Sequence, residues 1–139
     1  MKKITLLITL LLFIYAINAQ SIIGKWKTID DETGKAKSIV EIYKKGDKYY
    51  GKIVDILDAT KKKNKCKLCE DYRKDQPILG MEIIKDLEQD DDEFEDGTIL
   101  DPNNGKIYDC KIWLEDKNTL SVRGYILFFF RTQTWHRVN

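Results

Sequence analysis

Hydrophobic and polar residues alternate along most of the chain, in short runs that are separated by turn-forming residues. The runs are rich in Ile, Val, Tyr, Trp and Thr, which favour β-strands. No window of useful length shows a helical period, and the segment 66–75 could hold one helical turn at most. We therefore expect roughly eight strands, at residues 21–30, 37–45, 48–57, 78–87, 97–100, 106–115, 119–127 and 130–138.

Two connections stand out between these runs. The sequence DPNNG at 101–105 predicts a tight turn, because Pro fixes φ after the opening Asp and Asn-Gly accepts positive φ. The sequence EQDDDEFEDG at 88–97 is polar or charged apart from Phe94 and the closing Gly97, and it lacks the ligand order and central Gly of an EF-hand. We expect it to be a solvated acidic loop rather than a calcium site.

Short connections between successive strands indicate an antiparallel meander. Such a sheet has to close or fold over to bury its apolar face and remove its edges. We predict an all-β fold, a single antiparallel barrel of roughly eight strands, with room for side chains or one small ligand. A two-sheet β-sandwich is the alternative architecture.

The first residues have the features of an export signal. A basic start, MKK, precedes the apolar run ITLLITLLLFIYAI, and Ala19 offers a small residue at a cleavage site. We expect residues 1–19 to be a signal peptide, cleaved near Ala19, and 20–139 to form a single domain in the periplasm or outside the cell. A retained N-terminal anchor is the alternative; after cleavage no membrane span is expected.

The charge of the exported part is balanced. The 24 Lys and Arg less Lys2 and Lys3 stand against 23 Asp and Glu, which gives a net charge near −1. This balance argues against nucleic acid or an anionic membrane as the main partner.

Cys66 and Cys69 lie three residues apart in a lysine-rich connection. In an oxidising compartment nearby cysteines tend to pair, which favours a disulfide between them. A redox pair of the thioredoxin kind and a zinc site completed by Cys110 and His136 are the alternatives. Cys110 alternates with apolar residues of its strand, which predicts a buried free thiol, with an intermolecular disulfide as the alternative.

The last two strands carry the candidate binding residues. Alternation puts four side chains of the last strand on one face, and Arg123 and Tyr125 share a face of the strand before it. If the four face the barrel interior, they form a polar, anion-binding pocket beside aromatic rings; if they face outward, they form a surface stripe or a clamp around a tryptophan. The candidate ligand-binding residues are Trp26, Arg123, Tyr125, Arg131, Gln133, Trp135 and Arg137.

Several strings along the chain form a series: GKWKTIDDETGKAKSIVEIY, YYGKIV, CKLC, DQPILG, ILDPNNGKIYDCKIWL, LSVRGYI and RTQTWHRV. In this order they resemble the bacterial exported family named domain of unknown function 2147. The resemblance implies a small exported domain with a lipocalin-like barrel. The opening Gly24-Lys25-Trp26 is similar to the Gly-x-Trp of lipocalins, in which an arginine of a late strand packs across the tryptophan ring. Arg131 and Arg137 are the available arginines here.

Motifs for catalysis are absent from the sequence. The only histidine, His136, has no nucleophile motif near it, and neither Gly-x-Ser-x-Gly nor His-Glu-x-x-His occurs. We expect an exported, non-catalytic barrel that binds a small amphipathic or anionic molecule, without a cofactor or metal. The alternatives are a structural or protein-interaction module of the cell envelope and a hydrolase that uses a pair of carboxylates.

Overall fold

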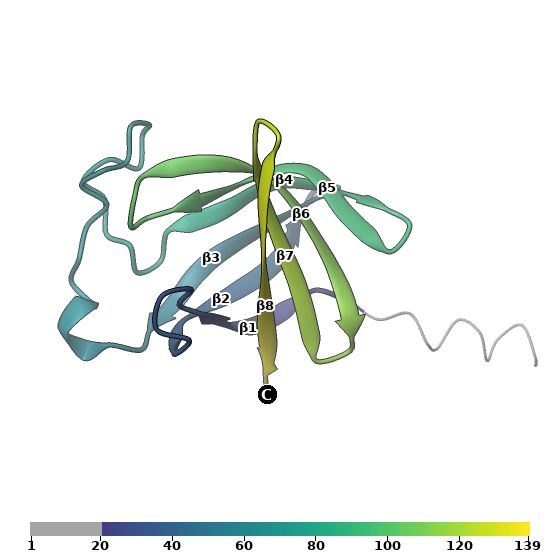
Figure 1. Ribbon diagram of the computed structural model, residues 1–139, viewed down its shortest axis with the longest axis horizontal. Helices are drawn as coiled ribbons and strands as arrows, with labels where there is room; N and C mark the ends of the chain where they lie inside the picture. Colours follow the sequence, from purple (N-terminus) through teal and green to yellow (C-terminus); the bar gives the residue numbers. More distant parts are fainter. Residues whose placement is uncertain (1–20) are drawn as a thin grey trace, which may run out of the picture.

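The computed structural model describes residues 21–139, and the expected signal peptide and its cleavage site lie outside the described residues. Eight strands follow one another in a closed antiparallel barrel (Figure 1). The prediction of a single barrel is confirmed, and a two-sheet sandwich is excluded. The elements are β1 (Gly24–Ile29), β2 (Ala36–Lys45), β3 (Lys48–Ile56), the 3₁₀ helix η2 (Ala59–Lys61), β4 (Glu82–Asp90), β5 (Glu93–Asp101), β6 (Lys106–Asp116), β7 (Thr119–Ile126) and β8 (Phe129–Val138).

The barrel closes where the first strand pairs with the last. Lys25, Trp26 and Lys27 of β1 lie opposite Val138, Arg137 and His136 of β8. Because every strand then has two neighbours, the described barrel has no free sheet edge.

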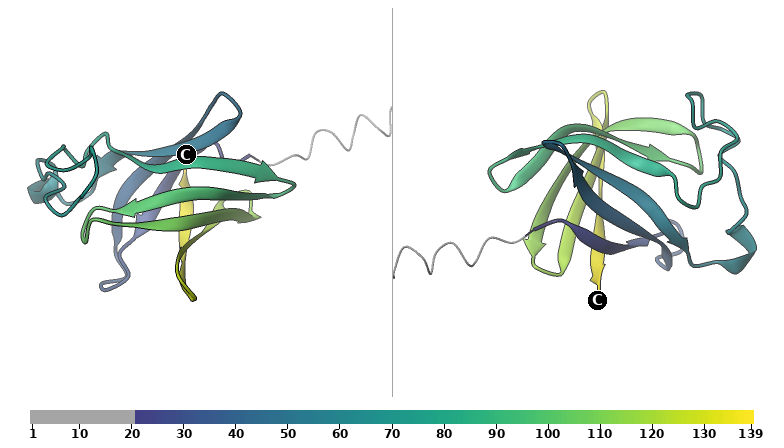
Figure 2. Two further views of the ribbon diagram at one scale, coloured as in Figure 1. Left: turned by 90° about the horizontal axis from the view of Figure 1, so that it is seen from above. Right: turned by 180° about the vertical axis from the view of Figure 1, so that it is seen from behind.

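Because the strands run alternately up and down, successive connections lie at opposite ends of the barrel. The β1–β2, β3–β4, β5–β6 and β7–β8 connections share one end, which we call the loop end. The other three turns share the opposite end with the start of β1 and the end of β8, and we call it the base. The long β3–β4 connection stands out from one side of the barrel (Figure 2).

The acidic segment 88–97 is not a loop, so that prediction was wrong. β4 and β5 form a hairpin through it, in which Gln89 pairs with Phe94 and Asp90 with Glu93. Phe94 is buried and packs edge-on against Tyr49, with ring centroids 4.8 Å apart. Phe94 is the one apolar side chain that the segment places in the core, while its acidic side chains remain at least partly exposed to solvent.

The disulfide between Cys66 and Cys69 is confirmed, and it lies in the β3–β4 connection against the β5–β6 turn. The sulfur of Cys66 lies 3.8 Å from the carbonyl oxygen of Pro102. Gly105 adopts positive φ (72°), and a Cβ at this position would clash with the Leu68 carbonyl. The disulfide loop is therefore docked on the barrel, and Gly105 allows the close approach.

Candidate functional site

The four candidate side chains of β8 face the interior of the barrel. Trp135 lies opposite Leu120 and Gln133 opposite Val122, and Leu120 and Val122 belong to the buried core. Paired residues of an antiparallel sheet point to the same side, so Arg131 and Arg137, which alternate with these positions, also lie on the inner face.

At the base, Arg137 and Trp26 form the clamp that the Gly-x-Trp resemblance implied. Trp26 is fully buried, its indole N–H donates to the Ile22 carbonyl at 2.8 Å, and the Arg137 guanidinium lies 4.3 Å from its ring centroid. The guanidinium also donates to the carbonyl oxygens of Ser21 (2.7 Å), Ile23 (3.1 Å) and Lys117 (2.7 Å). Arg137 rather than Arg131 therefore closes this end of the barrel.

Gly24 makes room for the clamp. Its φ is 136°, a conformation that residues with a Cβ rarely adopt, and a Cβ there would lie 2.8 Å from Nη1 of Arg137. The Gly-x-Trp sequence thus serves the packing of Arg137 as well as the burial of the tryptophan.

At the loop end, a chain of hydrogen bonds runs along the inner face of β8. The indole of Trp135 donates to Oε1 of Gln133 at 2.9 Å, and the Gln133 amide donates to Oδ2 of Asp31 at 2.8 Å. Nη1 of Arg131 donates to the same Asp31 oxygen at 3.3 Å. Exposure to solvent rises along this series of hydrogen-bonded side chains, from Trp135 at 2% to the Arg131 side chain at 76%.

Polarity also changes along the barrel axis. Near the base the interior is apolar, with Trp26, Val40 and Ile42 fully buried. Toward the loop end, Thr28 and Ser38 are buried and share a hydrogen bond of 2.7 Å. The barrel interior is therefore apolar toward the base and carries hydrogen-bonding side chains toward the loop end.

Arg123 and Tyr125 lie on the outer face, away from the other five candidates. Arg123 pairs with Thr132 in the sheet and donates to its Oγ1 at 2.7 Å. Its guanidinium lies 4.5 Å from the Phe130 ring and 4.8 Å from the Trp113 ring. The seven candidates thus divide into a base clamp, a loop-end network and an outer aromatic cluster.

The zinc alternative loses its ligands in this fold, whereas the redox alternative, whose oxidised form is this same disulfide, stays a prediction. Cys66 and Cys69 are bonded to each other, Cys110 is buried in the core, and His136 pairs with Lys27 on the outer face. Over residues 21–139, no group of three or more His, Cys, Asp or Glu side chains could hold a metal ion. Burial raises the pKa of the Cys110 thiol to about 12, which disfavours a reactive thiolate.

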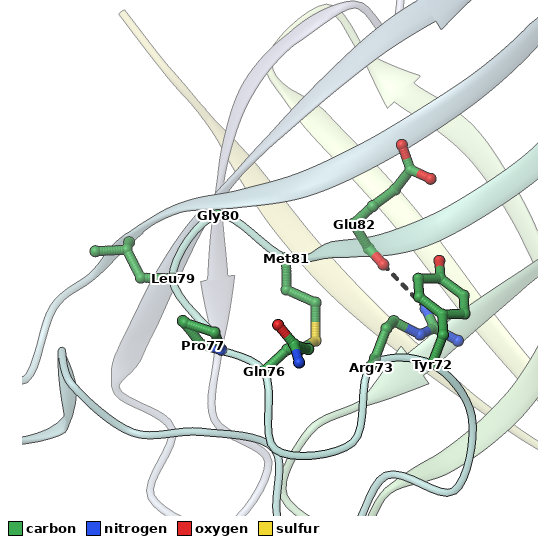
Figure 3. A pocket seen from close by; sticks show the side chains of 8 residues that line it. All are labelled: Tyr72, Arg73, Gln76, Pro77, Leu79, Gly80, Met81 and Glu82. Atoms are coloured by element: carbon green, nitrogen blue, oxygen red, sulfur yellow. Dashed lines mark hydrogen bonds between the residues drawn. The ribbon is translucent and has the colours of Figure 1, made fainter.

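Sequence reasoning missed Arg73, which is only 4% exposed in the β3–β4 connection. Its guanidinium makes a two-pronged contact with Asp71, with Nη2 at 2.7 Å from Oδ2. Figure 3 shows its other contact, in which Nη1 donates to the Glu82 carbonyl at 2.9 Å. It stands beside a cavity of about 380 Å³ whose lining residues are Tyr72, Arg73, Gln76, Pro77, Leu79, Gly80, Met81 and Glu82. Because internal partners occupy the guanidinium, Arg73 fastens the connection to β4. The Asp-x-Arg spacing in this connection was the one sequence feature that could have indicated the ion pair.

Sequence reasoning missed Asp31 as well, because an acidic residue in the turn predicted between the first two strands does not by itself indicate a binding site. Its carboxylate folds back over the loop end to reach Gln133 and Arg131. Only the closure of β1 against β8 brings these residues together.

An eight-stranded closed meander with Gly-x-Trp in its first strand and an arginine of the last strand across the tryptophan ring is a lipocalin-like barrel. The chain belongs to the bacterial family described as "Uncharacterized protein conserved in bacteria (DUF2147)", whose model matches residues 24–137. This confirms the family indicated by the sequence motifs.

Among solved structures, the chain is similar to protein HP1028 from the human pathogen Helicobacter pylori, described as belonging to the lipocalin family. The two share 20% sequence identity with a TM-score of 0.77, over 87% of this chain and 85% of that one. At this identity the likeness establishes the fold alone. No significant match was found among curated proteins. Across residues 21–139, no helix is long and apolar enough to cross a membrane.

Proposed function

We propose that this protein is a non-catalytic binding protein for a small amphipathic anion, which it takes up at the loop end of the barrel. One observation carries the proposal: Arg131 and Gln133 on the inner face of β8 already hold a carboxylate, that of Asp31. An anionic ligand would take the place of this carboxylate.

The donors at this position suit such an exchange. A guanidinium and a primary amide direct several N–H groups toward one point, and guanidinium recognises carboxylate and phosphate geometry well. The Arg131 side chain is 76% exposed and its ion pair with Asp31 is a surface pair, so the contact costs little to open.

The side chains below support an amphipathic rather than a purely polar ligand. Gln133 is followed inward by Trp135, and both lie beside the apolar side chains of Val122 and Leu120. A ligand with its anionic group on Arg131 would place its apolar part against these apolar side chains. They are at most 3% exposed, so its entry requires the loop end to open, and the apolar surface then buried contributes about 25 cal/mol per Å².

We also propose that the protein works after export, in the periplasm or outside the cell, following cleavage near Ala19. The Cys66–Cys69 disulfide supports this setting, because disulfides persist mainly in oxidising compartments. The two alternatives from the sequence, an envelope interaction module and a hydrolase, stay predictions.

A titration with two matched amphiphiles tests the binding proposal. Dodecanoate should bind, and dodecyltrimethylammonium, which carries an apolar chain of similar length and the opposite charge, should bind at least about tenfold more weakly, as expected for loss of a charge-assisted contact. Equal affinity for the two probes, measured by isothermal titration calorimetry, would overturn the proposal.

Two variants with opposite expected effects locate the site. Arg131→Gln should weaken dodecanoate binding about tenfold, whereas Asp31→Asn should strengthen it because the competing carboxylate is gone. Arg123→Gln is the matched control, since it removes the same charge from the outer face. A loss of affinity in Arg123→Gln equal to that in Arg131→Gln would place the site elsewhere.

A further inference from the structure

The β7–β8 hairpin ends in an exposed apolar tip, which projects from the barrel (Figure 1). Leu127 and Phe128 are 89% and 97% exposed, more than any other large apolar side chain of the described residues. We call this the hairpin tip; its residues are Ile126, Leu127, Phe128, Phe129 and Phe130. A cluster of this kind marks an interaction site more often than single exposed apolar residues do.

The turn itself is unfavourable for folding. Ile126 and Phe129 pair, so Leu127 and Phe128 form a two-residue turn, and Leu127 has a φ of 53°. Asn and Gly are the residues that such turns favour, and Gly is usual where only the first central residue has positive φ. A leucine at positive φ and a phenylalanine exposed to water bury little apolar surface in the barrel, which points to a role outside folding.

Aromatic rings and arginines follow directly behind the tip. The rings of Tyr125 and Phe130 lie 5.9 Å apart, and the Arg123 guanidinium lies 4.5 Å from the Phe130 ring and 4.8 Å from the Trp113 ring. Arg131 pairs with Gly124, one step closer to the tip than Arg123. Apolar residues thus stand at the tip, and aromatic residues and arginines stand behind it. A bilayer has the same order, from the apolar acyl chains to the anionic headgroups.

The distances agree with shallow insertion. Three residue steps separate Leu127 and Phe128 of the turn from the pair of Gly124 and Arg131, or about 10 Å at about 3.3 Å per residue. Elements that lie in a membrane interface reach about 5–10 Å below the headgroups. A tip inserted to this depth would leave Arg131 and Arg123 at the phosphates.

The local charge favours an anionic surface, although the charge of the whole chain is balanced. Residues 119–139, which include β7 and β8, contain no Asp or Glu; of their three arginines, Arg123 and Arg131 lie toward the tip and Arg137 lies at the base. Asp31 is the acid paired with Arg131, and it is itself half-exposed.

We propose that the hairpin tip docks the protein on an anionic lipid bilayer, with the tip in the headgroup–acyl boundary and Arg123 and Arg131 on lipid phosphates. The inference goes beyond the proposed ligand binding. It shares Arg131 with that site, but the hairpin tip itself lies outside the network of Asp31 and Gln133, so docking through the tip does not depend on ligand binding.

Sedimentation with vesicles of phosphatidylglycerol and phosphatidylcholine, without added ligand, tests this docking. The wild-type protein should sediment with the vesicles. The double variant Leu127→Gly, Phe128→Ser should bind at least about tenfold more weakly, because the apolar area that enters the bilayer is lost. The same variant should be no less stable to urea, because glycine relieves the positive φ of the turn. Leu68→Ser, which changes another exposed leucine, should bind as the wild type does.

The charge contribution has its own readout. Replacing both Arg123 and Arg131 by Gln should lower binding to anionic vesicles about fivefold per arginine, with little change on pure phosphatidylcholine. Failure of the wild-type protein to sediment, or full binding by the tip variant, would overturn the proposal. So would a wild-type dimer in analytical ultracentrifugation that the tip variant loses, since the tip would then bind a second copy of the chain.

Discussion

The guanidinium of Arg137 lies 4.3 Å from the ring centroid of Trp26, and this contact joins the last strand of the barrel to the first. The same two residues are partners in the β1–β8 ladder. Arg137 adds three hydrogen bonds to carbonyl oxygens of the chain just before β1 and of the β6–β7 turn. One side chain therefore fastens three segments at the base.

Arg137→Ala should lower the free energy of unfolding by about 2–3 kcal/mol, because a cation–π contact and several charge-assisted hydrogen bonds are lost. Urea denaturation followed by tryptophan fluorescence measures the change. Arg131→Ala is the control; its exposed ion pair should be worth less than about 1 kcal/mol. Equal losses in the two variants would contradict a special role of the base clamp.

Gly24→Ala should destabilise the barrel through the same clamp. A Cβ at Gly24 meets Nη1 of Arg137 at 2.8 Å and also has to accept a φ of 136°. Gly46→Ala separates these causes, because Gly46 has positive φ but a Cβ added there would meet nothing within 4 Å. We expect the free energy of unfolding to fall by about 2–3 kcal/mol in Gly24→Ala and by about 1 kcal/mol in Gly46→Ala.

A double-mutant cycle completes this test. If Gly24→Ala acts by displacing the guanidinium, it should cost less in the Arg137→Ala background than in the wild type. Strict additivity of the two free-energy changes would mean that the glycine acts through its own backbone alone.

The ion pair of Asp71 and Arg73 should make the β3–β4 connection sensitive to acid. The side-chain hydrogen bonds from Arg73 hold the pKa of Asp71 below its ordinary value of 3.8. A carboxyl group with a lowered folded pKa stabilises the protein above its unfolded pKa, and the stabilisation is lost as the pH falls through the folded pKa.

Asp71→Asn should therefore lower the free energy of unfolding by about 2 kcal/mol at pH 7, because a charged, hydrogen-bonded partner of a buried guanidinium is lost. Well below pH 3.8 the substitution should leave this free energy almost unchanged. Urea denaturation of both proteins from pH 7 to pH 2 measures the difference. A difference that is independent of pH would show that Asp71 acts by packing and not by its charge.

The three cysteines should be distinguished by thiol labelling. The folded, oxidised protein should show no reactive thiol, because Cys66 and Cys69 are bonded and burial raises the pKa of Cys110. Unfolding should expose one thiol, and unfolding with reduction should expose three. A reactive thiol in the folded protein, detected by intact mass after alkylation, would contradict the burial of Cys110.

Much of the fold was predictable because alternation and turn chemistry are local properties. The runs around Val40, Ile42 and Ile112 identify strands, and the meander order follows from short connections. The acidic segment 88–97 misled this reasoning, since Phe94 is its only apolar side chain in the core and the partner ring, Tyr49, is far away in the sequence.

The candidate site was predictable only in part. Alternation gave the shared face of Arg131, Gln133 and Trp135, but not the side of the sheet on which it lies. That side depends on which face of every strand is buried, which is a property of the closed barrel. Asp31 escaped detection for the same reason, because its partners lie about a hundred positions away along the chain.

The three indole N–H groups provide the most direct test of ligand binding at the loop end. Trp26 donates to Ile22 at the base, Trp113 to Glu115 on the outer face, and Trp135 to Gln133 in the proposed site. Addition of dodecanoate should shift the indole signal of Trp135 in a ¹⁵N–¹H correlation spectrum and leave those of Trp26 and Trp113 in place. A shift confined to Trp113 or Trp26, or an unchanged Trp135 signal at saturating dodecanoate, would contradict the account.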